Sequence, residues 1–354
     1  MTVKRNITVK NIYHMLAYAF KDVLKEKKYG NLRDEEFDHQ SDLLAAILVI
    51  GADSQIKRGL DKNYIPIIET KSVPTGRIDI SASIKNQTTM RSMLVCEFDD
   101  FTANIEINKI LKTALNILIK DKEVSPKNRK QLKKSLFFLG NIDLLDPADI
   151  KWSKIQYHKN NVTYRMLLYV CYLVISHSLM SENGKKKNLS DYFDDQKLGD
   201  LFENFVRNYY DVHYHSYVSS PRHIRWNTDN DDFAVFLPVM KTDIMLESKS
   251  STLIIDTKFY TNQIMQGQYE KKISSNNLYQ MYAYIKNKVD EKEKDGRDPN
   301  VVSGMILYAK TETGDDLDIE YSFSGNTIFV KTLNMNDDWK NIRSRLDSFI
   351  DFLN

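Results

Sequence analysis

Three charged residues, Asp243, Asp256 and Lys258, are spaced so that they meet at one end of a predicted β-hairpin. A short strand begins at Asp243 and runs to Leu246, residues 247–251 form a polar turn, and residues 252–259 form a second strand rich in β-branched and aromatic side chains. Side chains alternate along a strand, so Asp256 and Lys258 share a face. Antiparallel pairing around the turn brings Asp243 close to Asp256. We therefore expect two carboxylates and an ammonium group to converge.

Such a cluster suits the metal-dependent hydrolysis of phosphodiesters. Mg²⁺ is commonly bound by one or two carboxylates together with phosphate oxygens of the substrate, so Asp243 and Asp256 are the expected metal ligands, with Mn²⁺ as the alternative metal. A lysine beside the metal can orient the attacking water or stabilise charge on the phosphoryl oxygens, which is the role expected of Lys258. The structural alternative is an ion pair at a strand end, which is the commoner fate of isolated charges.

Apolar periodicity predicts further helices in the second half of the chain. Residues 162–179 are almost uniformly apolar, which indicates a helix in the core of the second domain. Residues 190–210 carry an apolar stripe, and Glu203 lies off that stripe. A later helix presents Gln280 and Tyr284 on one face, because they are four positions apart. The structural alternatives are a solvated carboxylate for Glu203 and helix-to-sheet packing for Gln280 and Tyr284.

The first half of the chain alternates short helices and strands. Periodicity and turn signals predict helices over 11–20 and 42–50, strands over 65–68 and 77–80, and two helical segments between 104 and 134, separated at Ser125-Pro126. The second helical segment is crowded with basic side chains, which are Lys127, Arg129, Lys130, Lys133 and Lys134. Such a run is commonly a solvated face, and the functional alternative is a surface for DNA phosphates or an acidic protein. Periodicity fades between 145 and 160, which indicates a domain boundary near residue 155.

The composition excludes several classes of protein. Fifty Lys and Arg residues against 48 Asp and Glu give a net charge of +2, so any nucleic-acid contact must come from local patches. Cys96 and Cys171 lie far apart in the sequence, which indicates neither a disulfide framework nor a zinc knuckle and suits a reducing cytoplasm. His213 and His215 alternate as on a strand but lack a third ligand at suitable spacing, so we interpret them as structural. The longest apolar run, 166–175, is too short for a membrane helix, and the amino terminus does not read as a secretory signal.

The charged cluster resembles a known pattern. An Asp on one strand followed by Asp-x-Lys on the next, here Asp243 and Asp256-Thr257-Lys258, is similar to the motif of the metal-dependent PD-(D/E)XK nucleases. The resemblance implies a central mixed sheet flanked by helices and catalytic roles for Asp243, Asp256 and Lys258. One feature departs from the family, since its first acid often follows a proline, whereas Pro238 lies well before Asp243.

Two further matches extend this resemblance. Gln280 to Tyr284, with the sequence QMYAY, matches the Gln-xxx-Tyr motif that accompanies the RecB-like branch of these nucleases. Glu203 matches an additional acidic residue often found in such folds. The resemblance implies a catalytic role for Gln280, an auxiliary role for Tyr284 and a place for Glu203 among the metal ligands.

A series of collinear motifs narrows the resemblance to McrC, the family of nuclease subunits of McrBC-type modification-dependent restriction systems. The motifs are Val9 to Phe20, Arg58 to Leu60, Gly76 to Asp79, Asn108 to Lys112, Thr242 to Ile244, Ile254 to Tyr260 and Asn277 to Gln280. The resemblance implies a subunit that binds no nucleotide and works with McrB, a GTP-hydrolysing AAA+ ring that recognises methylated cytosine in DNA. The sequence agrees in that it lacks the G-x-x-x-x-G-K-[ST] phosphate loop.

We therefore expect an α/β protein of two domains. Residues 1–155 form a mixed α+β domain that contacts the McrB-like AAA+ GTPase, and residues 156–354 form a PD-(D/E)XK restriction-endonuclease-like domain. The expected function is Mg²⁺-dependent cleavage of double-stranded DNA in a 5-methylcytosine-specific restriction system of the cytoplasm, with stimulation of the partner's GTPase and no membrane contact. The alternatives are a non-catalytic regulator that docks on the ring and a stand-alone RecB-like nuclease.

Overall fold

A computed structural model describes most of the chain. The described residues are 7–20, 29, 32, 37–152, 155, 162–181, 195–214, 216–217, 223–228, 236–259, 265–266, 271–294, 296, 301–311 and 316–353. They form two compact units, one of residues 38–184 and one that combines residues 1–37 with 185–354. No helix within these described ranges has the length and apolar content needed to cross a membrane.

The amino-terminal helix belongs to the same unit as the carboxy-terminal half. Helix α1 (Val9–Ala19), which matches the helix predicted over 11–20, packs against α9 (Asp195–His213). The side-chain amide of Asn11 also donates hydrogen bonds of 2.9 and 2.8 Å to the carbonyl oxygens of Met335 and Asp337. This discontinuous unit does not follow the contiguous boundary that the sequence indicated near residue 155.

The unit of residues 38–184 has a helical part. It consists of α4 (Gln40–Arg58), α6 (Glu106–Lys120), α7 (Pro126–Phe138), the short η3 (Pro147–Asp149) and α8 (Val162–Ser181). Helix α8 confirms the apolar helix over 162–179, but its predicted membership of the second domain's core is wrong. It packs on α4 and α6 because its apolar surface meets theirs, and a Cβ at Gly51 of α4 would collide with Leu167. The predicted break before α7 is confirmed, since the Ser125 side chain caps that helix.

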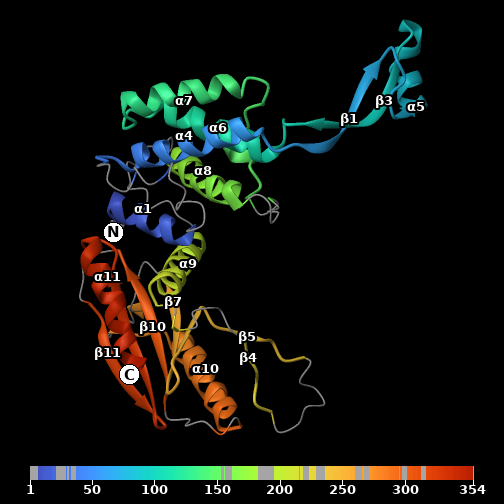
Figure 1. Ribbon diagram of the computed structural model, residues 1–354. Helices are drawn as coiled ribbons and strands as arrows, with labels where there is room; N and C mark the ends of the chain where they lie inside the picture. Colours follow the sequence, from blue (N-terminus) through green and yellow to red (C-terminus); the bar gives the residue numbers. More distant parts are fainter. Residues whose placement is uncertain are drawn as a thin grey trace. The chain divides into compact units, whose positions relative to one another are not determined.

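The same unit carries a three-stranded antiparallel sheet. Its strands are β1 (Asn63–Lys71), β2 (Arg77–Asp79) and β3 (Leu94–Thr102), in the order β1-β3-β2, with α5 (Ile80–Lys85) and η2 (Thr88–Arg91) between β2 and β3. We call residues 63–102 the arm, which Figure 1 shows reaching beyond α4 and α6. Gly76 has a φ of 63°, so the turn before β2 uses a left-handed conformation that glycine adopts easily. The strands expected over 65–68 and 77–80 are thus confirmed.

The other unit is built on a five-stranded mixed sheet. The strand order is β11 (Asp318–Phe323), β12 (Asn326–Asn334), β10 (Val302–Lys310), β7 (Thr252–Lys258) and β6 (Ile244–Glu247). Strand β10 runs parallel to β7 and β12, while the edge strands β6 and β11 are antiparallel to their neighbours. Two short ribbons, β4 (His223–Ile224) with β5 (Met240–Lys241) and β8 (Met265–Gln266) with β9 (Lys271–Lys272), complete the described strands.

Helices cover both faces of this sheet. Helix α10 (Ser275–Lys294) packs so closely on one face that a Cβ at Gly304 would collide with the side chain of Met281. On the other face, Phe352 of η9 (Phe349–Leu353), which follows α11 (Trp339–Ser348), stacks on Phe329 at a centroid distance of 4.1 Å. The predicted mixed sheet flanked by helices is therefore confirmed as an arrangement.

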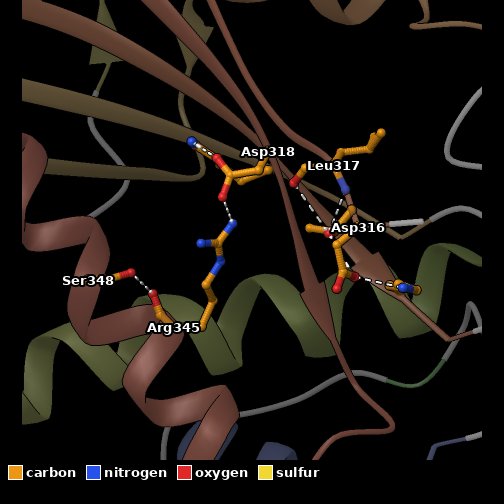
Figure 2. A network of polar contacts seen from close by, with 8 residues as sticks. Asp316, Leu317, Asp318, Arg345 and Ser348 are labelled. Atoms are coloured by element: carbon orange, nitrogen blue, oxygen red, sulfur yellow. Dashed lines mark hydrogen bonds and ion pairs between the residues drawn. The ribbon is translucent and has the colours of Figure 1, made fainter. Parts of the chain in front are cut away.

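Polar contacts fasten the edge strand β11 to this unit, as Figure 2 shows. Arg345 of α11 donates a 2.7 Å hydrogen bond to Asp318, which also pairs with Lys331 of β12. The Ser348 hydroxyl donates to the Arg345 carbonyl oxygen at 2.8 Å, and Lys310 pairs with Asp316 at 2.7 Å. Both lysine side chains are more than nine-tenths buried, so the carboxylates compensate charges that the sheet would otherwise leave unpaired.

The structure describes only one of the two histidines that the sequence analysis interpreted as structural. His213 lies on α9 and not on a strand, because the apolar stripe of that helix continues to its last turn. Its Nε2 shares a 2.7 Å hydrogen bond with the Tyr18 hydroxyl, which agrees with a structural role. His215 lies outside the described residues. Cys96 and Cys171 are both buried free thiols, in line with the expected absence of a disulfide between them.

Candidate active site

The predicted hairpin exists, with a register one residue away from the expectation. A five-residue turn would have set Leu246 opposite Thr252, whereas the structure pairs Leu246 with Leu253. The difference arises because Glu247 joins the ladder opposite Thr252, and the remaining turn is closed by a 2.9 Å hydrogen bond from Ser248 N to the Ser251 carbonyl. The ladder continues to Ile244, so the residue just before it, Asp243, meets the end of β7 as predicted.

Asp243 is held by a residue that the sequence did not single out. Its Oδ2 accepts two hydrogen bonds from Thr257, one of 2.8 Å from the backbone N–H and one of 2.9 Å from the side-chain hydroxyl. Hydrogen bonds to a carboxylate are stronger than those between neutral groups, so they fix the orientation of Asp243. The signal that could have identified Thr257 is its position inside Asp-Thr-Lys, since the antiparallel pairing that brings Asp243 to the end of β7 also brings it to Thr257.

Asp256 and Lys258 form a buried ion pair. Lys258 Nζ lies 2.7 Å from Asp256 Oδ2, which confirms that the two side chains share a face of β7. The exposed fractions of the side chains are 2% for Asp256 and 15% for Lys258. Despite the ion pair, Asp256 Oδ2 accepts no hydrogen bond of normal geometry from any described residue. Burial, together with the negative charge of Asp243, raises the pKa of Asp256 to about 6, and Lys258 opposes this shift.

A short chain of hydrogen bonds links Lys258 to α10. Lys258 Nζ donates to Gln280 Oε1 at 3.2 Å, Gln280 Nε2 donates to the Tyr284 hydroxyl at 2.8 Å, and that hydroxyl donates to the Lys241 carbonyl at 2.8 Å. Gln280 and Tyr284 therefore lie on one face of the helix, as their spacing predicted. Tyr284 is only 6% exposed and packs in the core beneath α10. It therefore also has the alternative role of packing the helix against the sheet.

Glu203 lies on α9 and is half-buried. Its Oε1 accepts a 2.8 Å hydrogen bond from Arg207, one turn later on the helix. Burial raises its pKa, and so does the negative charge of Asp243, while Arg207 lowers it. The charge of Glu203 in turn contributes to the raised pKa of Asp256. Helix α9 contacts β7, and Phe202 of α9 meets Phe259, the residue after β7, at a centroid distance of 6.0 Å. The three carboxylates thus interact electrostatically, although Glu203 is engaged by its own arginine.

The donor chemistry of the cluster fits a hard divalent cation. Asp256 Oδ2 is buried and contacts the Lys258 ammonium group without a hydrogen bond of normal geometry, and Asp243 and Glu203 both add negative charge that a cation would neutralise. Within the described part of the chain, no three His, Cys, Asp or Glu side chains are grouped closely enough to hold a metal ion by themselves. A cation bound here would therefore need ligands from water or substrate besides two carboxylates, which is the usual preference of Mg²⁺.

Comparisons with known proteins agree with the motif series. The sequence profile described as "McrBC 5-methylcytosine restriction system component" matches residues 3–295. The type IV methyl-directed restriction enzyme EcoKMcrBC of Escherichia coli strain K12 is 26% identical over 351 residues, which cover 98% of each chain.

Two solved structures from Thermococcus gammatolerans are also similar. A half-complex from a tetradecameric assembly of McrB AAA+ hexamers with bound McrC matches 97% of this chain and 76% of its own chain, with a TM-score of 0.46 and 14% identity. The McrBC complex solved by cryo-electron microscopy matches 56% of each chain, with a TM-score of 0.40 and 14% identity. Because the profile match spans most of the sequence, the chain belongs to the family of McrBC 5-methylcytosine restriction system components.

Proposed function

We propose that this chain is the DNA endonuclease subunit of a modification-dependent restriction system, with Asp243, Asp256 and Lys258 as its catalytic residues. The observation that carries the proposal is the Asp256–Lys258 pair at 2.7 Å, buried at the end of a strand whose first four residues are apolar or Thr and fully buried. A buried ion pair contributes little to stability and is often unfavourable, so chemistry is a better reason for its presence. Family membership supplies the restriction context, and the domain would be of the PD-(D/E)XK type.

In the proposed mechanism the carboxylates and the lysine have different roles. Asp243 and Asp256 would hold Mg²⁺ or Mn²⁺, and Glu203 would reach the cation through a bound water, because the three carboxylates are not grouped closely enough to bind it together. When bound, the cation supplies Lewis-acid polarisation of the phosphodiester and offsets the carboxylate charges. Lys258 donates hydrogen bonds to the attacking water or to a phosphoryl oxygen, where negative charge develops.

Bond making and bond breaking are expected in line. The water oxygen bonds to phosphorus and gives up a proton to solvent, while the bond from phosphorus to the leaving oxygen breaks and that oxygen takes up a proton. Gln280 accepts a hydrogen bond from Lys258 and so limits the directions in which the ammonium group can point. Tyr284 holds Gln280 in turn through its 2.8 Å hydrogen bond. We therefore assign Gln280 to the catalytic machinery and Tyr284 to its support.

We further propose that the arm contacts a McrB-like AAA+ GTPase ring and that the contact stimulates GTP hydrolysis. The arm exposes apolar side chains that a partner could cover, which are Tyr64, Ile68, Val73, Ile78, Ile80, Ile84, Met90 and Phe101. Exposed apolar patches of this kind mark interaction sites. The solved Thermococcus gammatolerans assembly contains McrB AAA+ hexamers with bound McrC, which supports a ring partner for this chain as well. The sequence lacks a phosphate loop, so GTP would be bound by the partner, to which we also assign recognition of the methylated base.

The test combines the chain with the AAA+ partner, Mg²⁺, GTP and matched methylated and unmethylated DNA. We expect cleavage of the methylated DNA by the wild-type chain and none by Asp256→Asn. The control is Asp351→Asn, which removes an exposed carboxylate from the same unit and should cleave normally. Faster GTP hydrolysis without cleavage would instead support a non-catalytic regulator, and cleavage without partner or GTP would support a stand-alone nuclease.

A further inference from the structure

The exposed side of α7 carries only positive formal charge. The helix has five basic residues, Lys127, Arg129, Lys130, Lys133 and Lys134, and its sequence PKNRKQLKKSLFF contains no acid. Asn128, Leu132 and Ser135 are buried on the side that faces the unit's interior. The four lysines are all exposed on the remaining surface, and we call them the lysine face.

The helix that presents the lysine face is firmly anchored. Asn128 Nδ2 donates a 2.7 Å hydrogen bond to Asp42 Oδ1 of α4, and Ser125 N donates to the same oxygen at 2.9 Å. The Arg129 side chain stabilises the loop before α7, because its Nη2 donates to the carbonyl oxygens of Asp121 and Val124 at 2.8 and 2.9 Å. Arg129 therefore closes the loop before α7, and the anchored helix keeps the backbone of the lysine face in a fixed position.

The spacing of the lysine face matches a nucleic-acid backbone. Lys127, Lys130 and Lys134 follow the i, i+3, i+7 pattern, so they form one stripe with a rise of about 10 Å along the helix. Duplex DNA carries one phosphate per roughly 3.4 Å of axis on each strand, so the stripe spans about three phosphates. Lys130, Lys133 and Lys134 form no ion pair with any acid in the ranges that the structure describes.

We propose that the lysine face binds the phosphate backbone of duplex DNA during cleavage. This inference rests on the proposed nuclease function and adds a substrate contact on the unit that does not contain the catalytic residues. A net charge of +2 gives the chain no general attraction for DNA, so any contact that the chain itself makes with DNA must come from a local patch. An acidic protein is the less favoured occupant, because lysine is depleted from protein–protein interfaces whereas its flexible ammonium group suits phosphates.

The experiment replaces three of these charges in the full chain. Lys130→Gln, Lys133→Gln and Lys134→Gln are combined, and the binding of duplex DNA by the complex with its AAA+ partner is measured at several salt concentrations. We expect about tenfold weaker binding near physiological salt and a log K against log salt slope less negative by about 2 to 3, at roughly 0.9 per lost phosphate contact. The matched control combines Lys57→Gln, Lys249→Gln and Lys340→Gln, which removes three exposed charges elsewhere and should leave the slope nearly unchanged.

The outcomes separate this inference from the proposed function. An unchanged slope and affinity in a complex whose wild-type form cleaves DNA would overturn the lysine face and leave the nuclease intact. Loss of assembly with the AAA+ partner, measured by size-exclusion chromatography, would show that the face binds an acidic protein surface and would also overturn the inference. Failure of the wild-type complex to cleave any DNA would count against the nuclease proposal itself and would remove the basis of the inference.

Discussion

Strand β7 buries charged side chains, whereas strand β1 exposes apolar ones. In β7, Asp256 is 2% exposed, although it follows a run of buried apolar residues on a central strand. In β1, Tyr64 and Ile68 are 65% and 71% exposed, although strands usually cover such residues. Both arrangements are unfavourable for an isolated domain, since one removes a carboxylate from water and the other leaves apolar surface in it.

The difference between the two strands separates two kinds of function. A buried carboxylate that pairs with Lys258 and lies near a second carboxylate, Asp243, is suited to chemistry on a substrate. An exposed apolar strand is suited to a protein surface that covers it. If this distinction is correct, changes in β7 alter cleavage without altering assembly, whereas changes in the arm weaken assembly and, through it, the cleavage that depends on the partner.

The largest expected effect follows from removing the ammonium group of β7. Lys258→Ala should lower DNA cleavage by about 10³-fold, because the group that stabilises phosphoryl charge is lost. Stimulation of the partner's GTPase should be unchanged, and both activities are measured in the same reconstituted mixture. Lys286→Ala, on the partly exposed surface of α10, is the control and should retain cleavage. A Lys258→Ala variant that cleaves normally would refute the catalytic assignment.

The next effect concerns the arm. Ile68→Asp should weaken binding to the AAA+ partner by about 30-fold, the size expected for a buried interface anchor. The melting temperature should change little, because the side chain is exposed in the chain alone. Binding is measured by fluorescence anisotropy with labelled partner, and Phe236→Asp serves as the control, since Phe236 is 81% exposed in the other unit. Equal binding by all three proteins would place the partner contact elsewhere.

A smaller loss is expected from the residue that orients Asp243. Thr257→Val removes the 2.9 Å hydroxyl hydrogen bond but keeps the 2.8 Å bond from the backbone, so cleavage should fall by about tenfold. Thr257→Ser should restore most of the activity, because it returns the hydroxyl. The Mg²⁺ concentration that gives half-maximal cleavage should also rise in Thr257→Val alone. If Ser and Val variants behave alike, the hydroxyl does not position the carboxylate.

The sequence was sufficient for the parts of the site that depend on local periodicity. Alternation correctly paired Asp256 with Lys258, and helical spacing correctly brought Gln280 and Tyr284 onto one face, because both rules involve residues close together in the chain. The contact between Thr257 and Asp243 was missed because it crosses between strands, and its geometry depends on a register that differed by one residue from the prediction.

For the fold too, the sequence predicted local elements better than contacts between residues far apart in the chain. Most predicted helices and strands are present, but the assignment of α8 to the second domain failed because an apolar helix does not encode which neighbours it contacts. Helix α1 likewise joined the carboxy-terminal unit through contacts such as Asn11 with Met335, which lie more than three hundred residues apart. The catalytic roles and the bound metal remain predictions that the experiments above address.

The smallest effect concerns the stability of β7 and follows from the raised pKa of Asp256, about 6 against an ordinary 3.8. The folded state binds this proton more tightly than the unfolded state, so the free energy of unfolding falls as the pH rises from about 4 to 6. Above that window the full penalty of the buried charge is present, and Asp256→Asn removes it. In buffer with EDTA we therefore expect a melting temperature about 2–4 °C higher for Asp256→Asn at pH 8, with a smaller difference at pH 5. A lower melting temperature at pH 8 would mean that attraction to Lys258 outweighs the burial of Asp256, and β7 would then carry its charge for stability.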